Sequence, residues 1–294
     1  MLLNLLQAIR PKTLSIAFAV ILLGQLLAWH DLSYISNAAI DPLIAFLCFS
    51  CCLCLQIAVN LANDYFDHLS GVDGEDRLGP KRSIQSGKLT LKTLKGSIAL
   101  FTLLAIISGS YLVIQGGWIF LGLGIASLMG IFLYSGSKYS FASRSLGELA
   151  VFLFFGWLAV IGSYYLQVKQ FHWGLLIPAS EIGALVAAVM LVNNIRDIRS
   201  DHLAGKITLA YRLGPIKSRG LYGLLLLLPF VLLPLNPYLP WLNSVLLPLH
   251  LGLCFLIRKR TGSALNTQLA QSSILVLAWS LGYLFSFLLS PIAY

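Results

Sequence analysis

Two short segments hold most of the 11 acidic residues of the sequence, at spacings that suit metal chemistry. Asn60, Asp64 and Asp67 follow one another at helical intervals, so a helix places them on one face. Asp197 and Asp201 are one helical turn apart. Carboxylates stacked in this way repel one another, and we expect a cation between them. Mg²⁺ suits such a site because it takes hard oxygen ligands and completes its shell with water and phosphate.

These segments predict a catalytic site that binds metal and diphosphate. The predicted catalytic residues are Asp64, Asp67, Asp197 and Asp201. The predicted metal ligands are Asp64, Asp67, Asp73, Asp76, Asn193, Asp197 and Asp201. Carboxylates and cations in one pocket suit a diphosphate held through bridging metal ions, with Arg and Lys on its outer oxygens. The predicted diphosphate ligands include Asn60, Asn63, Arg77, Lys81, Arg82, Arg196 and Lys206.

A competing interpretation treats these residues as solvated charges at a membrane edge. That interpretation suits any single Lys or Arg, because basic residues gather in cytoplasmic loops. It does not explain acids gathered at helical spacing. If the acids do crowd one another, replacing one by its amide should relieve repulsion and cost no stability. Glu181, a lone acid on the far side of the membrane, should tolerate replacement almost silently.

The composition is typical of a multi-pass membrane protein. Of 294 residues, 58% are apolar and only 11% are charged, whereas soluble domains carry about a quarter charged residues. This excludes soluble globular, disordered, collagen-like and disulfide-rich classes. The net charge of +9 lies in short loops between apolar runs, so it does not form a nucleic-acid footprint. The five cysteines lie in apolar runs and are interpreted as small membrane-embedded thiols.

Apolar runs near the 20 residues that span a bilayer predict an all-α polytopic protein with about nine transmembrane helices. The runs lie at about 14–29, 42–62, 97–115, 117–134, 148–166, 174–194, 217–235, 240–257 and 270–290. All Lys and Arg residues except Lys169 fall on one side of this arrangement. The positive-inside rule therefore predicts a cytoplasmic N-terminus and a C-terminus outside. We expect one domain over 1–294, with cytoplasmic acidic loops at about 63–96 and 195–216.

Longer motifs resemble a known family. The stretches NLANDYFDHLSGVDGEDRLGPKRSIQSGKLT (60–90) and LVNNIRDIRSDHLAGKITLAYRLG (191–214) resemble the paired Asp-rich motifs of the UbiA superfamily of intramembrane aromatic prenyltransferases. They are most similar to its 1,4-dihydroxy-2-naphthoate polyprenyltransferase branch. RPKTL (10–14), LGELAVFLFFG (146–156), GSYYLQ (162–167) and Leu265-Asn266 also fit. In other superfamily members a lysine of the loop that holds Lys138 meets the diphosphate, so the resemblance adds Lys138 to the diphosphate ligands.

The resemblance implies helices around a central cavity, capped on the cytoplasmic side by the two acidic loops. It implies transfer of a polyprenyl group from polyprenyl diphosphate to 1,4-dihydroxy-2-naphthoate, with loss of diphosphate and CO₂, to give demethylmenaquinol. The implied cofactor is Mg²⁺. The protein is expected in the lipid of the cell inner membrane, with its active site facing the cytoplasm. No nucleic-acid partner is expected. Aromatic π faces from Tyr65, Tyr139, Tyr164 and Tyr165 could stabilise the allylic cation.

Two alternatives remain open from the sequence. The first is the same chemistry on another aromatic acceptor, such as 4-hydroxybenzoate or homogentisate, or on haem. The second is a cation-coupled transporter, in which intramembrane acids bind ions. Transporters place such acids near the bilayer midplane on broken helices, whereas these acids cluster at one face. The pattern therefore favours the enzyme.

Overall fold

A computed structural model describes residue 5 and residues 8–35, 38–69, 89–133 and 142–289. These ranges are helical and contain no strand. Several residues singled out in the sequence lie outside them: Asp73, Asp76, Arg77, Lys81, Arg82, Lys138 and Tyr139. Their predicted roles stay predictions.

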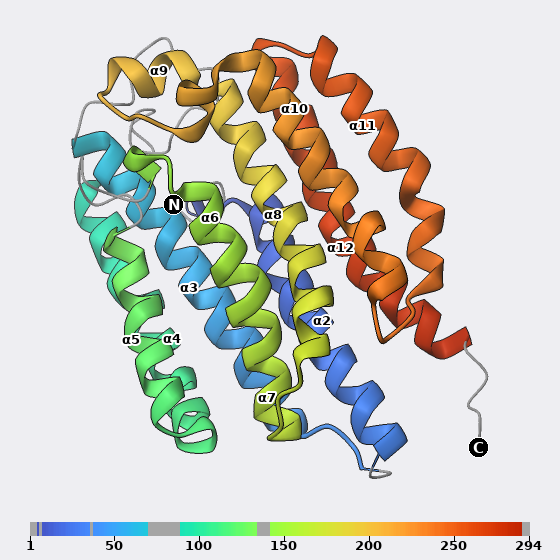
Figure 1. Cartoon of the computed structure of the whole chain (residues 1–294). Coiled ribbons are helices and arrows are strands. Elements are labelled where there is room, and N and C mark those ends of the chain that lie inside the picture. The colour runs from blue at the N-terminus through green and yellow to red at the C-terminus, as the bar shows by residue number, and fades with distance from the viewer. Residues whose placement is uncertain (1–4, 6–7, 36–37, 70–88, 134–141, 290–294) are drawn as a thin grey trace.

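The described helices form a bundle whose members run roughly antiparallel to their neighbours in sequence (Figure 1). The long helices of the first half are α2 (Pro11–Ile35), α3 (Pro42–Leu69), α4 (Leu91–Gly116) and α5 (Trp118–Leu133). A short turn η1 (Ala142–Arg144) leads into one continuous rod of α6 (Gly147–Val151), the π-helix η2 (Phe152–Ile161) and α7 (Gly162–Val168). The second half comprises η3 (Trp173–Leu175), α8 (Leu176–Arg196), α9 (Ile198–Leu203), α10 (Leu209–Leu232), η4 (Leu233–Leu235), η5 (Trp241–Leu246), α11 (Leu247–Lys259), η6 (Gly262–Ala264) and α12 (Leu265–Leu289).

The helices agree closely with the predicted spans. Within the described ranges, eight are long and apolar enough to cross a membrane. They correspond to eight of the nine predicted runs. The remaining run, 117–134, becomes α5, an apolar helix of 16 residues that is shorter than the other spans. The all-α polytopic architecture is confirmed, while the count of nine and the orientation of the termini stay predictions.

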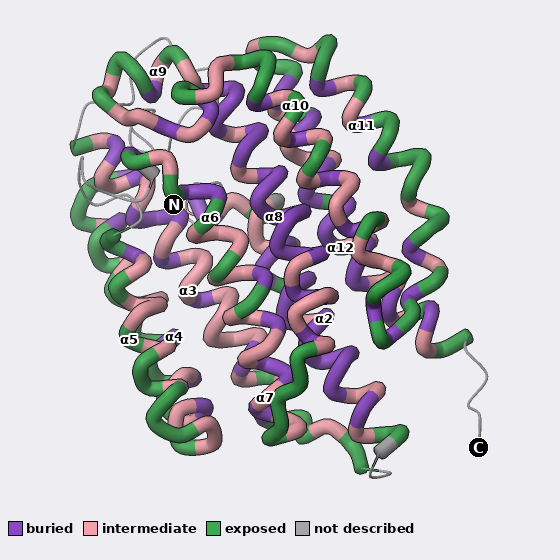
Figure 2. The backbone as a smooth tube through the Cα atoms, in the orientation of Figure 1, coloured by how far each residue is buried: buried purple, intermediate pink, exposed green. Residues whose placement is uncertain are grey.

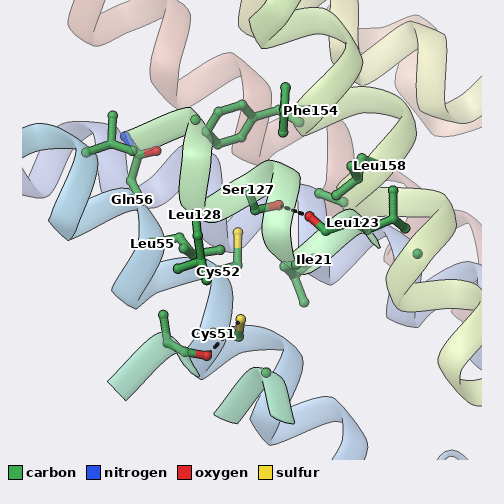
Figure 3. A pocket seen from close by; sticks show the side chains of 18 of the residues that line it. Ile21, Cys51, Cys52, Leu55, Gln56, Leu123, Ser127, Leu128, Phe154 and Leu158 are labelled. Atoms are coloured by element: carbon green, nitrogen blue, oxygen red, sulfur yellow. Dashed lines mark hydrogen bonds between the residues drawn. The ribbon is translucent and has the colours of Figure 1, made fainter. Parts of the chain in front are cut away.

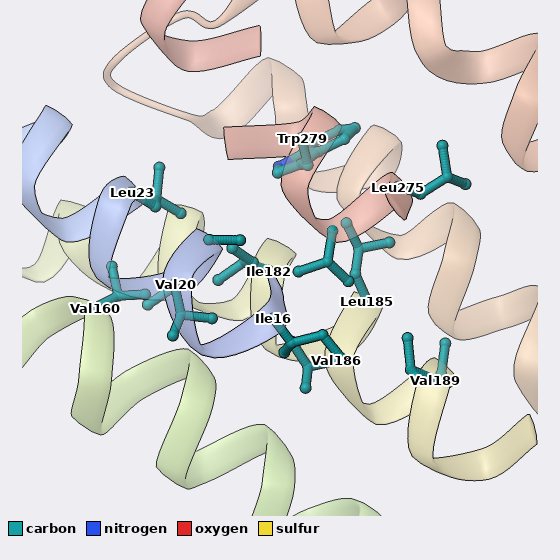
Figure 4. Close-up of a cluster of buried hydrophobic side chains, with 14 of the residues drawn as sticks. Ile16, Val20, Leu23, Val160, Ile182, Leu185, Val186, Val189, Leu275 and Trp279 are labelled. Atoms are coloured by element: carbon teal, nitrogen blue, oxygen red, sulfur yellow. The ribbon is translucent and has the colours of Figure 1, made fainter. Parts of the chain in front are cut away.

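Helix α8 is the axis of the bundle. In the 18-residue apolar window of its span, 78% of the residues are buried, and α10, η2 and α12 pack around it. Figure 2 shows buried residues concentrated on α8, α12 and α2 and exposed residues on the peripheral helices. Ile182, Leu185 and Val186 of α8 meet Val20 of α2 and Trp279 of α12 in the main apolar core (Figure 4). Large apolar side chains such as Trp118 are exposed on the outer surface, as expected where lipid is the solvent.

Small residues bring η2 and α8 into close contact, as is common between membrane helices. A Cβ atom added at Gly156 would lie 2.6 Å from the carbonyl oxygen of Ala179 and 2.8 Å from the Cα of Gly183. No larger side chain fits without separating the two helices. This contact fixes η2, which forms one wall of the cavity described below, against the central helix.

At the end of the bundle opposite α9, polar residues tie the helices together. Asp31 at the end of α2 accepts hydrogen bonds from the hydroxyls of Tyr164 at 2.6 Å and Tyr238 at 2.9 Å. His30 Nδ1 lies 3.0 Å from the same carboxylate. Burial and the Asp31 carboxylate raise the pKa of Tyr238, which keeps that hydroxyl a donor. Tyr164 therefore serves this cluster, and the idea that its ring stabilises an allylic cation at the acidic site is wrong.

Glu181 is not a tolerant lone acid. Its side chain is fully buried, and its carboxylate accepts from the Tyr283 hydroxyl at 2.6 Å, Asn236 Nδ2 at 2.8 Å and Trp279 Nε1 at 3.2 Å. We therefore expect its replacement to cost stability, because an amide there turns one acceptor oxygen into a donor that faces other donors. Its expected small effect on turnover stays a prediction.

The contact between Gly156 and Gly183 predicts a loss of stability when it is filled. Gly156→Val should lower the free energy of unfolding by about 1–3 kcal/mol, the usual cost of overpacking. Thermal unfolding in detergent measures it. Gly122→Val is the matched control, since no atom lies within 4 Å of an added Cβ there. Equal unfolding midpoints for both variants would show that the close approach does not hold η2 on α8.

Candidate active site

The first acidic motif occupies the end of α3 near α9 (Figure 1). Asn60, Asp64 and Asp67 all lie on this helix and are buried, with exposed fractions of 3%, 4% and 6%. The predicted shared face is therefore confirmed. Asn60 Nδ2 donates to the Ile9 carbonyl at 2.9 Å, which fixes the chain segment that leads into α2. From that segment the guanidinium of Arg10 forms an ion pair with Asp64.

The second motif lies where α8 gives way to α9. Asp197 breaks the helix with φ −100° and ψ 10°, and the amide of Asp201 donates to its carbonyl at 2.8 Å, so the two acids are one turn apart as predicted. Arg196 is 7% exposed and binds the motif from inside. Its Nε donates to Asp197 Oδ1, and its terminal nitrogens donate to Asn193 Oδ1 and Asn266 Oδ1, each at 2.8 Å. The guanidinium therefore positions Asp197 against both asparagines.

A helix cap places Lys206 between the two motifs. Gly205 follows α9 with φ +76°, its amide donates to the His202 carbonyl, and the amide of Lys206 donates to the Asp201 carbonyl at 2.8 Å. This pattern is a Schellman cap, which needs a residue such as glycine at the left-handed position. The chain emerges so that Lys206 Nζ lies 2.6 Å from Asp67 Oδ1. One ion pair thus joins the end of α3 to the loop after α9.

Below the motifs an elongated cavity of about 470 Å³ runs along α3 (Figure 3). Its polar end includes Arg10, Asn60, Asn63 and Asn193. The rest is lined mainly by apolar side chains and thiols of α3, α5, η2 and α8: Cys48, Cys51, Cys52, Leu55, Leu123, Leu128, Phe154, Leu158, Val186 and Val189. All five cysteines are free, in keeping with their interpretation as small apolar thiols. The cavity therefore offers a polar mouth and a long apolar interior.

Burial decides between the two interpretations of the acids. Asp64, Asp67, Asp197 and Asp201 are between 4% and 9% exposed. Solvated charges at a membrane edge would keep their carboxylates in water, so that interpretation fails for these four. Buried carboxylates need opposite charge, and Arg10, Lys206 and Arg196 supply it to Asp64, Asp67 and Asp197.

The chemistry of the donors suits Mg²⁺, although the described residues contain no cluster of three His, Cys, Asp or Glu side chains close enough to hold a metal alone. Mg²⁺ usually binds one or two carboxylates and fills its shell with water and phosphate oxygens, so a complete protein cage is not required. Amide oxygens of Asn63 and Asn193 line the cavity mouth, and the carboxylate of Asp64 lies beside it through the ion pair with Arg10, so hard ligands lie at and next to the mouth. The set fits a metal that arrives with a diphosphate.

The part that Arg10 plays was not predicted from the sequence. The sequence indicates Arg10 only as a cytoplasmic cation within the RPKTL segment, yet its guanidinium forms the ion pair of Asp64 and lines the cavity mouth. The available signal was the RPKTL segment at 10–14. Asn266 was noted only as part of the resemblance, and here it receives a hydrogen bond from Arg196. Both contacts join segments far apart in the sequence.

Fold and site together define a multi-pass helical membrane protein in which buried carboxylates on two helix ends close an apolar cavity. Residues 17–282 match the UbiA prenyltransferase family, and the chain belongs to that family. This membership settles the choice between enzyme and transporter in favour of the enzyme.

Individual relatives agree with the family. The chain is 39% identical to the 1,4-dihydroxy-2-naphthoate octaprenyltransferase of Escherichia coli strain K12, over 78% of this chain and 75% of that protein. It is 35% identical to the enzyme of the same name from Mycobacterium tuberculosis, over 92% of each chain. A UbiA homolog from Archaeoglobus fulgidus, solved with DMAPP and Mg²⁺, shares the fold with a TM-score of 0.64 at 14% identity, covering 96% of this chain and 99% of that one.

The buried ion pairs argue against the expectation that neutral variants of the acids cost no stability. Asp197→Asn leaves the buried Arg196 guanidinium without its counter-charge, and breaking such a pair costs about 3–5 kcal/mol. We expect a clearly lower thermal unfolding midpoint in detergent. Asp41→Asn is the matched control, because Asp41 is exposed and caps α3 through its Oδ1, which asparagine also offers. Equal midpoints for both variants would mean that the Arg196 pair does not stabilise the fold.

Proposed function

We propose that this protein transfers a polyprenyl group from a polyprenyl diphosphate to 1,4-dihydroxy-2-naphthoate, releasing diphosphate and CO₂ and giving demethylmenaquinol. The observation that carries the proposal is the pair of buried acidic motifs at the mouth of an apolar cavity, in a chain 35–39% identical to relatives named for this reaction. The bond from C1 of the prenyl chain to diphosphate breaks, and C1 joins the ring carbon that carries the carboxylate.

The polar mouth is where the diphosphate binds in this proposal. Arg10 forms an ion pair with Asp64, and Lys206 forms one with Asp67. A bound diphosphate could therefore share the positive charge of Arg10 and Lys206 with these carboxylates. Asn60 and Asn63 add amide groups at the same end of the cavity. Arg196 and the basic residues outside the described ranges complete the proposed diphosphate ligands: Arg77, Lys81, Arg82 and Lys138.

The same mouth would hold Mg²⁺. The proposed ligands are drawn from Asp64, Asp67, Asp73, Asp76, Asn193, Asp197 and Asp201. When bound, the metal supplies positive charge that offsets the charge of the departing diphosphate. The protein keeps the ligand oxygens together in a buried site, and Arg196 contributes by fixing Asp197 and Asn193.

The apolar part of the cavity suits the prenyl chain. From Asn63 to Cys48 the lining follows α3 for about 22 Å, at about 1.5 Å of rise per residue. Side chains from α5 and η2 also line the cavity, and α5 itself packs on α3 and α4. Such a lining excludes water from the allylic cation, which would otherwise be captured by hydrolysis.

In this proposal the acidic end faces the cytoplasm of a cell whose inner membrane contains the protein. The ends of α8 and α11, helix α9 and the loop after it place Arg196, Arg199, Lys206 and Arg258 at the acidic end, whereas Lys169 follows α7 at the other end. This asymmetry supports a cytoplasmic site by the positive-inside rule.

The reaction itself is the first test. Purified protein in liposomes, supplied with Mg²⁺, a polyprenyl diphosphate and a panel of aromatic acids, should convert 1,4-dihydroxy-2-naphthoate in preference to 4-hydroxybenzoate and homogentisate. Chelation by EDTA should abolish turnover, and added Mg²⁺ should restore it. Product mass by mass spectrometry is the readout. Preferred conversion of another acid would reassign the acceptor, and full activity after exhaustive chelation would remove the metal from the proposal.

A second test separates the motif acids from other acids. Asp64→Asn, Asp67→Asn, Asp197→Asn and Asp201→Asn should each lower turnover roughly a hundredfold or more, about 3 kcal/mol of transition-state stabilisation. Rates should be measured on protein shown to be folded, since some of these variants also lose an ion pair. Asp41→Asn, at the opposite end, should keep the wild-type rate. Folded Asp64 and Asp201 variants with wild-type rates would contradict a catalytic role for the motifs.

A further inference from the structure

Gln56 lies where the polar mouth of the cavity gives way to its apolar interior, and the proposed chemistry does not yet use it. It is half-buried on α3 and lines the cavity together with Cys52 and Asn60, one helical turn before and after it. Figure 3 shows its side chain among the lining residues. Of the lining amides on α3, Gln56 lies furthest from the acids, about 12 Å along the helix from Asp64 at about 1.5 Å of rise per residue.

Hydrogen bonds fix which way the Gln56 amide is turned. Asn60 Nδ2 donates to the Ile9 carbonyl at 2.9 Å and to Thr13 Oγ1 at 3.0 Å, which leaves Asn60 Oδ1 as an acceptor. Gln56 Nε2 donates to that oxygen at 3.4 Å. The nitrogen of the Gln56 amide is therefore turned toward Asn60, and the amide oxygen lies on its other side.

The amide oxygen of Gln56 is an acceptor that a ligand in the cavity can reach. Within the part of the chain that the structure describes, Oε1 receives no hydrogen bond, and unlike Glu148 Oε2 it is not enclosed by protein atoms. Gln25 on α2 shows the contrast. It is 5% exposed and outside the cavity lining, its Nε2 donates to the Ser163 carbonyl at 3.1 Å, and its Oε1 accepts from Gln167 Nε2 at 2.7 Å. Gln25 thus uses both ends of its amide to join helices, whereas Gln56 presents one end to the cavity.

The aromatic acceptor of the proposed reaction has two polar edges of different chemistry. Its carboxylate lies beside the 1-hydroxyl, and these two groups form an internal hydrogen bond, as in salicylate. This anionic edge favours the cations of the mouth. The 4-hydroxyl lies across the ring and remains a donor that needs an acceptor when it leaves water. Phe154 and Phe155, which η2 contributes to the lining, offer apolar ring faces for the naphthalene between these edges.

We propose that Oε1 of Gln56 accepts a hydrogen bond from the 4-hydroxyl of 1,4-dihydroxy-2-naphthoate. This inference rests on the proposed function and orients the acceptor, with its carboxylate toward the mouth and its 4-hydroxyl toward the interior. The hydrogen bond makes Gln56 a specificity-determining residue. An acid without the 4-hydroxyl displaces water from Oε1 without replacing its hydrogen bond, and a site built to bind a hydroxyl discriminates against such an analogue.

The test is Gln56→Met with 1,4-dihydroxy-2-naphthoate and 1-hydroxy-2-naphthoate, in liposomes with Mg²⁺ and a polyprenyl diphosphate. Methionine has a similar length but no amide. The second acid lacks only the 4-hydroxyl and is measured as a competitive inhibitor, so it need not react. In the wild type its inhibition constant should exceed the KM for the dihydroxy acid about tenfold.

The variant should lose this discrimination. Its KM for 1,4-dihydroxy-2-naphthoate should rise about tenfold, whereas the inhibition constant of 1-hydroxy-2-naphthoate and the KM for the polyprenyl diphosphate should stay within about twofold. The diphosphate site should be spared because Asn60 keeps its bonds to the Ile9 carbonyl and Thr13. If Gln56→Met is not recovered folded, Gln56→Ala gives the same comparison, because it also removes the amide.

Gln25→Met is the matched control. The same exchange at Gln25 should lower the unfolding midpoint, because both ends of that amide lose their role, and it should leave the KM for the acceptor unchanged. A folded Gln56 variant with an unchanged acceptor KM, with equal rises in that KM and in the inhibition constant, or with no turnover would overturn this inference. A wild type that does not convert 1,4-dihydroxy-2-naphthoate would overturn the proposed function, and this inference with it.

Discussion

The constraint on which this structure depends is the burial of like charges at the mouth of an apolar cavity. Carboxylates removed from water are strongly unfavourable unless opposite charge lies next to them. Three cations from three different parts of the chain satisfy this need: Arg10 before α2, Arg196 at the end of α8 and Lys206 after α9. The ion pairs of Arg10 and Lys206 thereby bring the ends of separate helices to one place, while the pair of Arg196 and Asp197 joins neighbours in the chain. The same ion pairs therefore form part of the site and hold this end of the bundle together.

The cavity exists because the helices are packed tightly elsewhere. Lipid gives helices no hydrophobic reason to associate, so close contact depends on small residues and polar bonds. The glycines of η2 and α8 are the small residues that allow close contact. The carboxylates of Asp31 and Glu181 accept the polar hydrogen bonds at the end of the bundle opposite the acidic motifs. With α8 and η2 fixed in this way, the space between α3, α5 and η2 stays open along the bundle.

Buried acids serve two different purposes in this protein, and their hydrogen bonds distinguish them. Glu181 and Asp31 receive neutral donors from tyrosine, asparagine and tryptophan side chains, which join helices. The acids at the mouth instead face arginine and lysine, whose charge a diphosphate can share. Glu148 belongs to neither group, since one of its oxygens meets a neutral amide and the other meets no partner among the described residues.

The sequence by itself determined the membrane class, the positions of the helices and the spacing of the motif acids. These features are local: apolar runs and helical intervals depend on residues that are near one another in the chain. Only the tertiary structure decided which charges meet. Arg10 and Asp64 are 54 positions apart, and Asp67 and Lys206 are 139 apart. The same holds for Glu181, which stands as a lone acid in the sequence and lies in a network built from α8, α12 and the segment after η4. Such contacts depend on how helices pack, and no periodicity in the chain records that packing.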